Sequence, residues 1–96
     1  MDFEWDEAKA EANEAKHGVT FEEAATVFSD DYARVIDDPD HSDKEDRFII
    51  LGLSLRAREL VVVHCYRQDE GAIRLISARE ATKKETSEYW RFRHAR

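Results

Sequence analysis

The spacing of hydrophobic residues changes near residue 32, and this change constrains the fold more than any other feature. Before it, apolar side chains recur at the three-and-four spacing of amphipathic helices. After it, apolar segments of strand length follow one another, and those at 48–53 and 60–66 are apolar on both faces, as in central strands. The order predicts helices first and a sheet second, which is an α+β architecture.

Two short helices are expected before residue 30. Asp6 can cap a first helix that runs to about Lys16, and Gly18 stands where a left-handed residue commonly ends a helix. Thr20 and Glu23 have the spacing of a capping box, in which two side chains satisfy backbone N–H groups reciprocally. They predict the start of the second helix.

Four strands and a last helix are expected after residue 30. Short connections between consecutive strands predict a four-stranded antiparallel meander, with Gly71 suited to a hairpin turn. The two N-terminal helices should cover one face, and the last helix part of the other face or an edge. The expected strands are 32–36, 48–53, 60–66 and 72–77, the expected helix is 79–94, and residues 3–5 are either a short strand or an apolar lead-in.

Length and composition fit one domain over residues 1–96. No apolar run approaches the ~20 residues that cross a bilayer. The first residues are acidic where a signal peptide would be basic, and the single Cys65 excludes an internal disulfide. These features predict a cytoplasmic protein.

The net charge of -7 conceals an uneven distribution. Residues 1–46 carry 16 acids and 4 bases, whereas residues 47–96 carry 6 acids and 11 bases. The overall charge argues against a general nucleic-acid binder, but the basic second half permits local binding of nucleic acid. An unevenly charged, solvated surface explains the same counts.

Residues 73–80 read Ile-Arg-Leu-Ile-Ser-Ala-Arg-Glu. Ser77 and Glu80 have capping-box spacing, so a strand should pass here into a helix. Arg79 would then lie in the first helical turn, where acids are preferred. A cation at that end predicts a bound anion such as phosphate. A salt bridge from Arg79 to Glu80 or Glu45 is the alternative.

Several short segments follow one another in a recognisable order: Phe3-x-Trp5-Asp6, Lys16-His17-Gly18-Val19, Glu45-x-Arg47, Ile76-Ser77-Ala78-Arg79 and Glu85. Taken in order, these segments resemble the BrnT family of toxins from bacterial type II toxin–antitoxin systems. The resemblance implies a RelE-like fold and an mRNA-cleaving endoribonuclease that acts by 2′-hydroxyl attack, without metal or cofactor. It also implies a BrnA-like ribbon-helix-helix antitoxin that neutralises the toxin and binds operator DNA with it.

Metal-free RNA cleavage needs a base, an acid and cations that stabilise the phosphorane. Arg79 is the first choice for the cation, because its planar fork can bind two phosphate oxygens. Arg47 could share the phosphate or pair with a nearby acid. His17 is the best general acid or base by type, and Lys16 could add charge, although a surface histidine at a helix end is an equally good interpretation of His17.

Further residues have a functional and a structural interpretation. Tyr89 could stack on a base or bind a phosphate, or it could pack against the sheet. Arg74 could bind substrate, or it could be an ordinary exposed strand arginine. His64 is expected in the core. The acidic loop at 37–43 lacks the glycine and glutamate of a calcium loop, so no metal site is predicted.

A second function class accounts for the same features. The chain could be a non-catalytic or weakly active protein that pairs with its antitoxin and helps to regulate their operon. A small-molecule enzyme is less well supported, because the sequence contains no glycine-rich phosphate loop.

Overall fold

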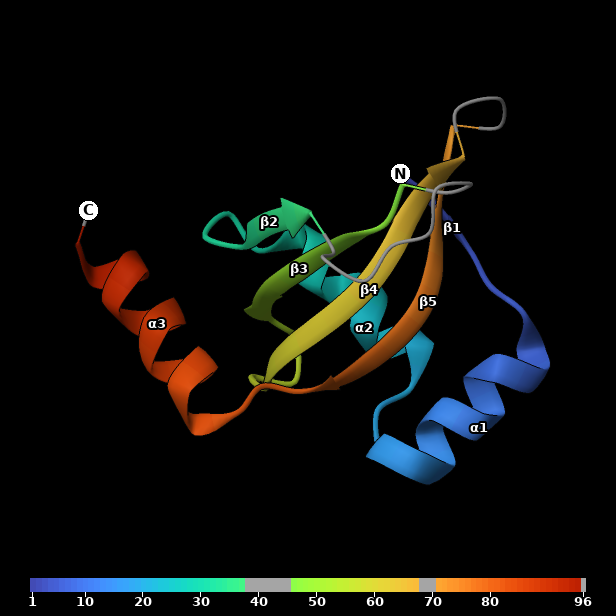
Figure 1. Cartoon of the computed structure of the whole chain (residues 1–96), viewed down its shortest axis with the longest axis horizontal. Coiled ribbons are helices and arrows are strands. Elements are labelled where there is room, and N and C mark those ends of the chain that lie inside the picture. The colour runs from blue at the N-terminus through green and yellow to red at the C-terminus, as the bar shows by residue number, and fades with distance from the viewer. Residues whose placement is uncertain (38–45, 68–70, 96) are drawn as a thin grey trace.

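The computed structural model describes residues 1–37, 46–67 and 71–95, which form one mixed sheet with three helices around it (Figure 1). The α+β class is therefore confirmed. No described helix has the length and apolar character needed to span a membrane. In chain order the elements are β1 (Asp2–Glu4), α1 (Glu7–His17), α2 (Phe21–Thr26), the 3-10 turn η1 (Val27–Ser29), β2 (Arg34–Asp37), β3 (Phe48–Leu53), β4 (Glu59–Arg67), β5 (Ala72–Glu80) and α3 (Lys83–His94).

The first strand corrects the predicted topology. The sheet order is β1-β5-β4-β3-β2, and β1 runs parallel to β5, with Asp2 opposite Ala72 and Glu4 opposite Arg74. Only β2 to β5 form the expected antiparallel meander, so the prediction of a purely antiparallel, four-stranded sheet is wrong. Residues 3–5 are too few for their sequence to indicate a partner, and the pairing depends on a strand 70 positions away.

The ends of α1 are as predicted. Asp6 is the N-cap, and its carboxylate accepts a hydrogen bond of 3.1 Å from the backbone N–H of Lys9. Gly18 follows the helix with φ of 70°, a left-handed conformation that glycine adopts without strain. Gly71 likewise has a positive φ of 65°. The acidic loop with Glu45, and residues 68–70 of the predicted hairpin, lie outside the described residues.

Asn13 joins α1 to the edge of β5. β1 covers that edge only from Ala72 to Arg74, which leaves the backbone of Ala78 without a strand partner on this side. The Asn13 side chain accepts from Ala78 N (3.0 Å) and donates to Ala78 O (2.9 Å), and it also donates to Val19 O. The buried Asn13 amide therefore forms the hydrogen bonds with the backbone N–H and C=O of Ala78 that a neighbouring strand would otherwise form.

The core lies between α2, η1 and one face of the sheet. Gly52 on β3 allows η1 to approach closely, because a Cβ there would lie 2.8 Å from Val27 Cγ1. His64 is fully buried, as predicted, with its ring nitrogens 3.3 Å from Val62 O and from the Tyr66 hydroxyl. Burial lowers the pKa of His64. The buried cluster comprises Val19, Phe21, Ala24, Val27, Ile50, Leu60, Val62, Ile73, Leu75 and Ala78.

A buried ion pair fastens α2 to the turn between β3 and β4. Thr20 caps α2, but the Glu23 carboxylate does not complete the predicted capping box. It accepts instead from the Arg58 guanidinium through both oxygens and from Ser54 Oγ at 2.7 Å. The hydrogen bonds from Arg58 lower the pKa of Glu23 despite its burial. Arg58 also donates to Gly18 O (3.1 Å) at the end of α1.

The junction between β5 and α3 differs from the prediction. β5 continues to Glu80 because it stays paired with β4, so Ser77 and Glu80 do not form a capping box. The helix begins at Lys83, with the capping box formed by Thr82 and Glu85. The sequence contains both boxes, and the longer pairing with β4 favours the second. Arg79 therefore lies on a strand rather than in the first turn of a helix.

Candidate functional site

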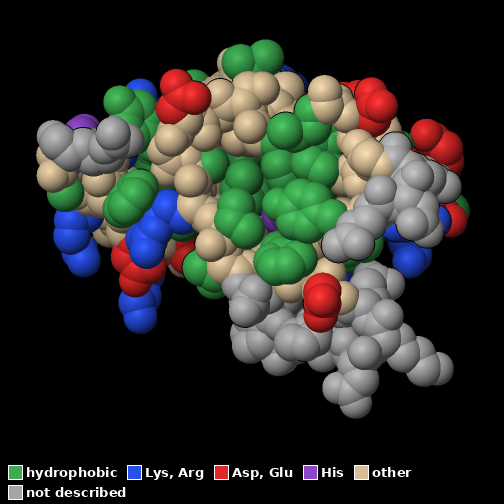
Figure 2. All heavy atoms as spheres, turned by 90° about the horizontal axis from the view of Figure 1, so that it is seen from above, with side chains coloured by type: hydrophobic (Ala, Val, Ile, Leu, Met, Phe, Trp, Pro, Cys, Tyr) green, Lys and Arg blue, Asp and Glu red, His purple; other side chains and the backbone are tan. Residues whose placement is uncertain are grey.

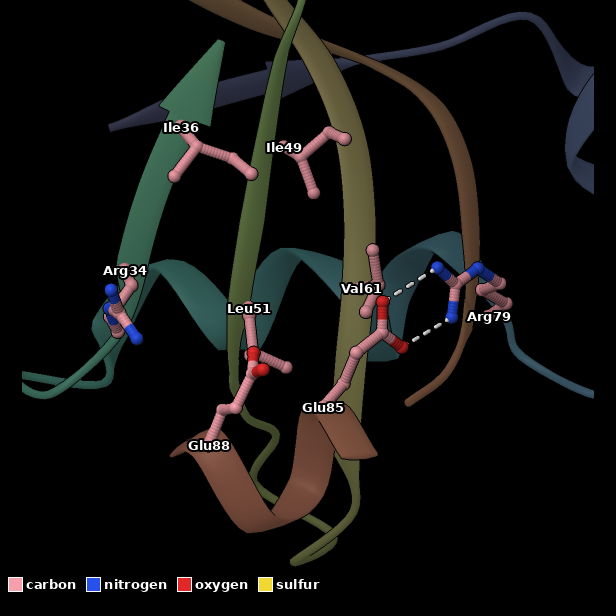
Figure 3. A pocket seen from close by; sticks show the side chains of 8 residues that line it. All are labelled: Arg34, Ile36, Ile49, Leu51, Val61, Arg79, Glu85 and Glu88. Atoms are coloured by element: carbon pink, nitrogen blue, oxygen red, sulfur yellow. Dashed lines mark hydrogen bonds and ion pairs between the residues drawn. The ribbon is translucent and has the colours of Figure 1, made fainter. Parts of the chain in front are cut away.

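The sheet face that turns away from the core carries a hollow of about 180 Å³, which α3 partly closes (Figure 3). Side chains alternate between the two faces of a strand, and this alternation directs Ile49, Leu51 and Val61 away from the core to form the floor. Two carboxylates come from α3 and two guanidinium groups from the strands. The lining residues are Arg34, Ile36, Ile49, Leu51, Val61, Arg79, Glu85 and Glu88.

Arg79 enters the hollow from β5 and forms a bidentate ion pair with Glu85. The distances are 2.8 Å from Nη1 to Oε1 and 3.0 Å from Nη2 to Oε2. Nη1 also donates to the Glu80 carbonyl at 3.2 Å. Two parallel charge-assisted hydrogen bonds fix the guanidinium in one orientation. The alternative prediction that Arg79 forms a salt bridge is therefore confirmed, but its partner is Glu85, whereas Glu80 or Glu45 was predicted.

The ion pair leaves one edge of Arg79 available. A guanidinium has five N–H donors, and the contacts to Glu85 and Glu80 use both hydrogens of Nη1 and one of Nη2. The remaining Nη2 hydrogen and the Nε hydrogen lie side by side and donate to no residue in the described part of the chain. The side chain is 41% exposed. Arg79 can therefore bind a second anion bidentately while Glu85 holds it.

The Glu85 carboxylate accepts hydrogen bonds from both Arg79 and Thr82. The hydrogen bonds from Arg79 are the largest cause that lowers the pKa of Glu85 to about 2, and the Thr82 backbone N–H also donates to its carboxylate at 2.8 Å. A carboxylate with so low a pKa is ionised near neutral pH and accepts a proton poorly. Glu85 is therefore suited to positioning Arg79 and starting α3, and not to general base catalysis.

We expect the stabilisation from Glu85 to disappear in acid. Its pKa of about 2 in the folded protein lies below the 4.5 of a free glutamate, so the stabilisation is complete above pH 4.5 and is lost as the pH falls towards 2. Thermal unfolding followed by circular dichroism should show a wild-type advantage over Glu85→Gln that is constant above pH ~5 and shrinks towards pH ~2. Glu88→Gln, at a carboxylate without a described partner, is the control. A difference that persists unchanged at pH ~2.5 would contradict this account.

Arg34 and Glu88 face the same hollow, and the sequence did not point to either. The Arg34 guanidinium lies 4.7 Å from the centre of the Phe92 ring, in a cation–π contact. Within the described ranges the side chains of Arg34 and Glu88 form no hydrogen bond or ion pair. Glu85 was part of the family resemblance but had no assigned role. No local signal showed that α3 returns across the sheet and brings these groups together.

Arg47 and Arg74 lie towards the other end of the sheet. Arg74 pairs with β4 four residues beyond the partner of Arg79, a distance of about 13 Å along the strand. Its guanidinium binds Glu4 at 2.8 Å, as expected of a partly exposed strand arginine. Arg47 directly precedes β3, and its buried Nε has no hydrogen-bond partner in the described structure.

His17 and Lys16 lie at the end of α1. Lys16 is exposed and His17 is partly exposed. No hydrogen bond or ion pair among the described residues links either side chain to Arg79 or Arg47. The structure therefore does not bring the predicted proton-transfer residues into contact with the hollow.

Tyr89 fastens α3 to the body of the protein. Its side chain is fully buried, and its hydroxyl donates to Asp30 Oδ2 (2.6 Å) and accepts from Arg93 Nη1 (3.0 Å). Burial, followed by the bond to Asp30, raises the pKa of Tyr89. On the same helix, Trp90 donates to Glu59 at 2.7 Å. Of the two predicted roles of Tyr89, the structure therefore shows packing inside the protein. Its ring has no exposed face on which an RNA base could stack.

Comparisons with known proteins agree with this architecture. A family model described as "Ribonuclease toxin, BrnT, of type II toxin-antitoxin system" matches residues 5–85. The 1.1 Å crystal structure of the Brucella abortus ribonuclease toxin BrnT is 28% identical, with a TM-score of 0.66, over 86% of this chain and 99% of that one. No curated protein matches. The chain therefore belongs to the BrnT family of ribonuclease toxins of type II toxin–antitoxin systems.

Proposed function

We propose that this protein is an endoribonuclease toxin that cleaves messenger RNA by a metal-independent reaction. Membership of a family of ribonuclease toxins supports the reaction class. The observation that carries the proposal is the Nε–Nη2 edge of Arg79, which has no partner among residues 1–37, 46–67 and 71–95 and which Glu85 holds in place beside a hollow. A rigid arginine with an open bidentate edge matches the geometry of a phosphate.

In the proposed reaction, the ribose 2′-oxygen attacks the adjacent phosphorus. The new bond forms as the bond to the 5′-oxygen breaks, and the products are a 2′,3′-cyclic phosphate and a 5′-hydroxyl. The proton leaves the 2′-hydroxyl for a base, and an acid protonates the departing 5′-oxygen. Arg79 stabilises the charge that develops on the non-bridging oxygens. Glu85 is a positioning residue that keeps the guanidinium oriented.

The other predicted site residues receive more limited roles in this proposal. The assignment of Arg47 to a phosphate elsewhere along the RNA rests on residue type alone, since its Nε is buried within the described structure. Arg74 contributes mainly to the structure of the sheet, through its ion pair with Glu4. The assignment of proton transfer to His17 or Lys16 rests on residue type alone, and Tyr89 acts by holding α3 in place.

A toxin of this type implies an antitoxin, which we propose is a BrnA-like ribbon-helix-helix protein that neutralises the toxin and brings it to operator DNA. Hydrophobic side chains gather in the middle of the surface seen in Figure 2. Val35, Ile36 and Tyr66 are 48%, 55% and 46% exposed. A contiguous group of exposed apolar side chains is typical of a protein-binding surface.

The direct test is to incubate the purified protein with total RNA, with and without a chelator. We expect equal cleavage in both reactions and fragments that end in cyclic phosphate and 5′-hydroxyl groups. Loss of cleavage with chelator would contradict metal independence, and intact RNA in both reactions would contradict the nuclease assignment.

The alternative function, a non-catalytic partner of the antitoxin, is favoured by the exposed apolar side chains alone. Inducing the protein without an antitoxin separates the two functions. Growth arrest is expected of the nuclease. Normal growth with soluble protein would support the non-catalytic protein.

A further inference from the structure

We propose that the hollow beside Arg79 binds a guanine base of the RNA, and that Glu88 and Arg34 select this base. The inference rests on the proposed function and adds the specificity of the same site. It assigns a role to the two charged groups of the hollow that the cleavage mechanism does not use.

The floor of the hollow suits a flat ring system. It is made by Ile49, Leu51 and Val61 on the open face of the sheet, with Ile36 at its side. An aromatic base can lie on such an apolar surface and exclude water from it. The volume of about 180 Å³ is that of a small single site rather than a groove for a peptide. Arg79 borders the same space, so a base in the hollow places its own phosphate near the free edge of Arg79.

The two remaining charged groups supply opposite kinds of hydrogen bond. Glu88 comes from α3 and only accepts, whereas Arg34 comes from β2 and only donates (Figure 3). Neither has a hydrogen-bond or ion-pair partner within the part of the chain that the structure describes. Arg34 packs over the Phe92 ring, and this contact leaves its N–H donors in the plane of the guanidinium available. Charged groups that line an apolar hollow with their hydrogen-bonding capacity unused can select a ligand with complementary polar edges.

Guanine has the edges that match this pair. Its N1–H and N2–H groups form two parallel donors for a carboxylate, and its O6 and N7 atoms form two acceptors for a guanidinium. Adenine offers a single exocyclic amino donor beside lone acceptors, and uracil has no amino group. Cytosine offers one amino donor to a carboxylate. Guanine alone can form two hydrogen bonds with each of Glu88 and Arg34.

The test uses short synthetic RNAs that are identical except for the base on either side of the cleavage site. We expect kcat/KM to be at least about tenfold higher with guanine at one of these positions, since a bidentate pair discriminates by this much. Glu88→Gln removes one acceptor, so the ratio between guanine and cytosine substrates should fall towards one. Arg34→Gln should lower the same ratio. Glu11→Gln, an equivalent change at an exposed position on α1, should leave the ratio as in the wild type.

A binding measurement separates this proposal from the nuclease assignment. Guanosine 3′-monophosphate and cytidine 3′-monophosphate are titrated by calorimetry into the wild type and Glu88→Gln, with circular dichroism to verify folding. Tighter binding of the guanosine nucleotide that is lost in Glu88→Gln supports the base site even if no RNA is cut. RNA cleavage without base preference, or a preference unchanged in Glu88→Gln, would overturn the base site and leave the nuclease standing.

Discussion

Replacing Arg79 by alanine should reduce RNA cleavage about 100-fold or more while the protein stays folded. Loss of a single donor that stabilises the charge of a transition state costs roughly that much, and alanine removes the whole guanidinium. Folding should survive because the ion pair is partly exposed, with Arg79 at 41% and Glu85 at 29%, and Glu85 keeps its bonds to Thr82. Single-turnover cleavage of a synthetic RNA measures the chemical effect, and thermal unfolding measures stability.

Two further variants make the result specific. Arg79→Lys keeps the charge but loses the planar fork, so its activity should lie between those of wild type and Arg79→Ala. Arg91→Ala removes an exposed arginine on α3 that lies outside the hollow, and its cleavage should match the wild type. A folded Arg79→Ala protein with undiminished cleavage would refute the assignment of Arg79.

Replacing Arg58 by alanine should destabilise the fold by about 3 kcal/mol, which is the largest stability effect expected here. The Glu23 carboxylate is only 4% exposed, and without Arg58 its charge would be buried with Ser54 as its remaining side-chain donor. For a domain of this size the midpoint of thermal unfolding should fall by roughly 10 °C or more. Urea unfolding gives the free energy directly. Arg74→Ala breaks the more exposed pair with Glu4, and its cost should stay below about 1 kcal/mol.

The cause of the Arg58 effect can be tested separately. If the cost arises from an unpaired buried charge, removing that charge should recover stability. The double variant Glu23→Gln with Arg58→Ala should then be more stable than Arg58→Ala alone. A double variant at least as unstable as the single one would show that the lost packing of Arg58 dominates.

Local signals in the sequence were enough for some elements. α1 was predicted because Asp6 and Gly18 mark its two ends within one short segment. β3 was predicted with its observed bounds because an apolar run of that length has few other interpretations. A short strand near residues 3–5 was one of two predicted alternatives, but its pairing was not predicted, and the start of α3 was predicted wrongly. The parallel pairing of β1 and the extension of β5 to Glu80 are decided by contacts with distant strands, which no local pattern encodes.

The same distinction applies to the candidate site. Arg79 was predicted to bind an anion because it was expected at a helix end, and that physical reason was wrong, since Arg79 lies on a strand. Its orientation comes from Glu85, six residues later, after the chain has turned into α3. Arg34 and Glu88 line the same hollow because α3 crosses the face of a sheet whose edge strand, β2, carries Arg34. Sequence spacing alone cannot predict such convergence.

The closure of the β5 edge by Asn13 has a consequence for biosynthesis. β1 and α1 are translated before β5, since Asn13 lies 65 residues before its partner Ala78 and Glu4 lies 70 residues before Arg74. A nascent chain that ends before Ala72 has no strand on which either segment can dock. Glu85 and Glu88, which line the hollow from α3, are translated later still. The site can therefore assemble only after α3 has been translated, so a chain that stops before α3 has an incomplete site.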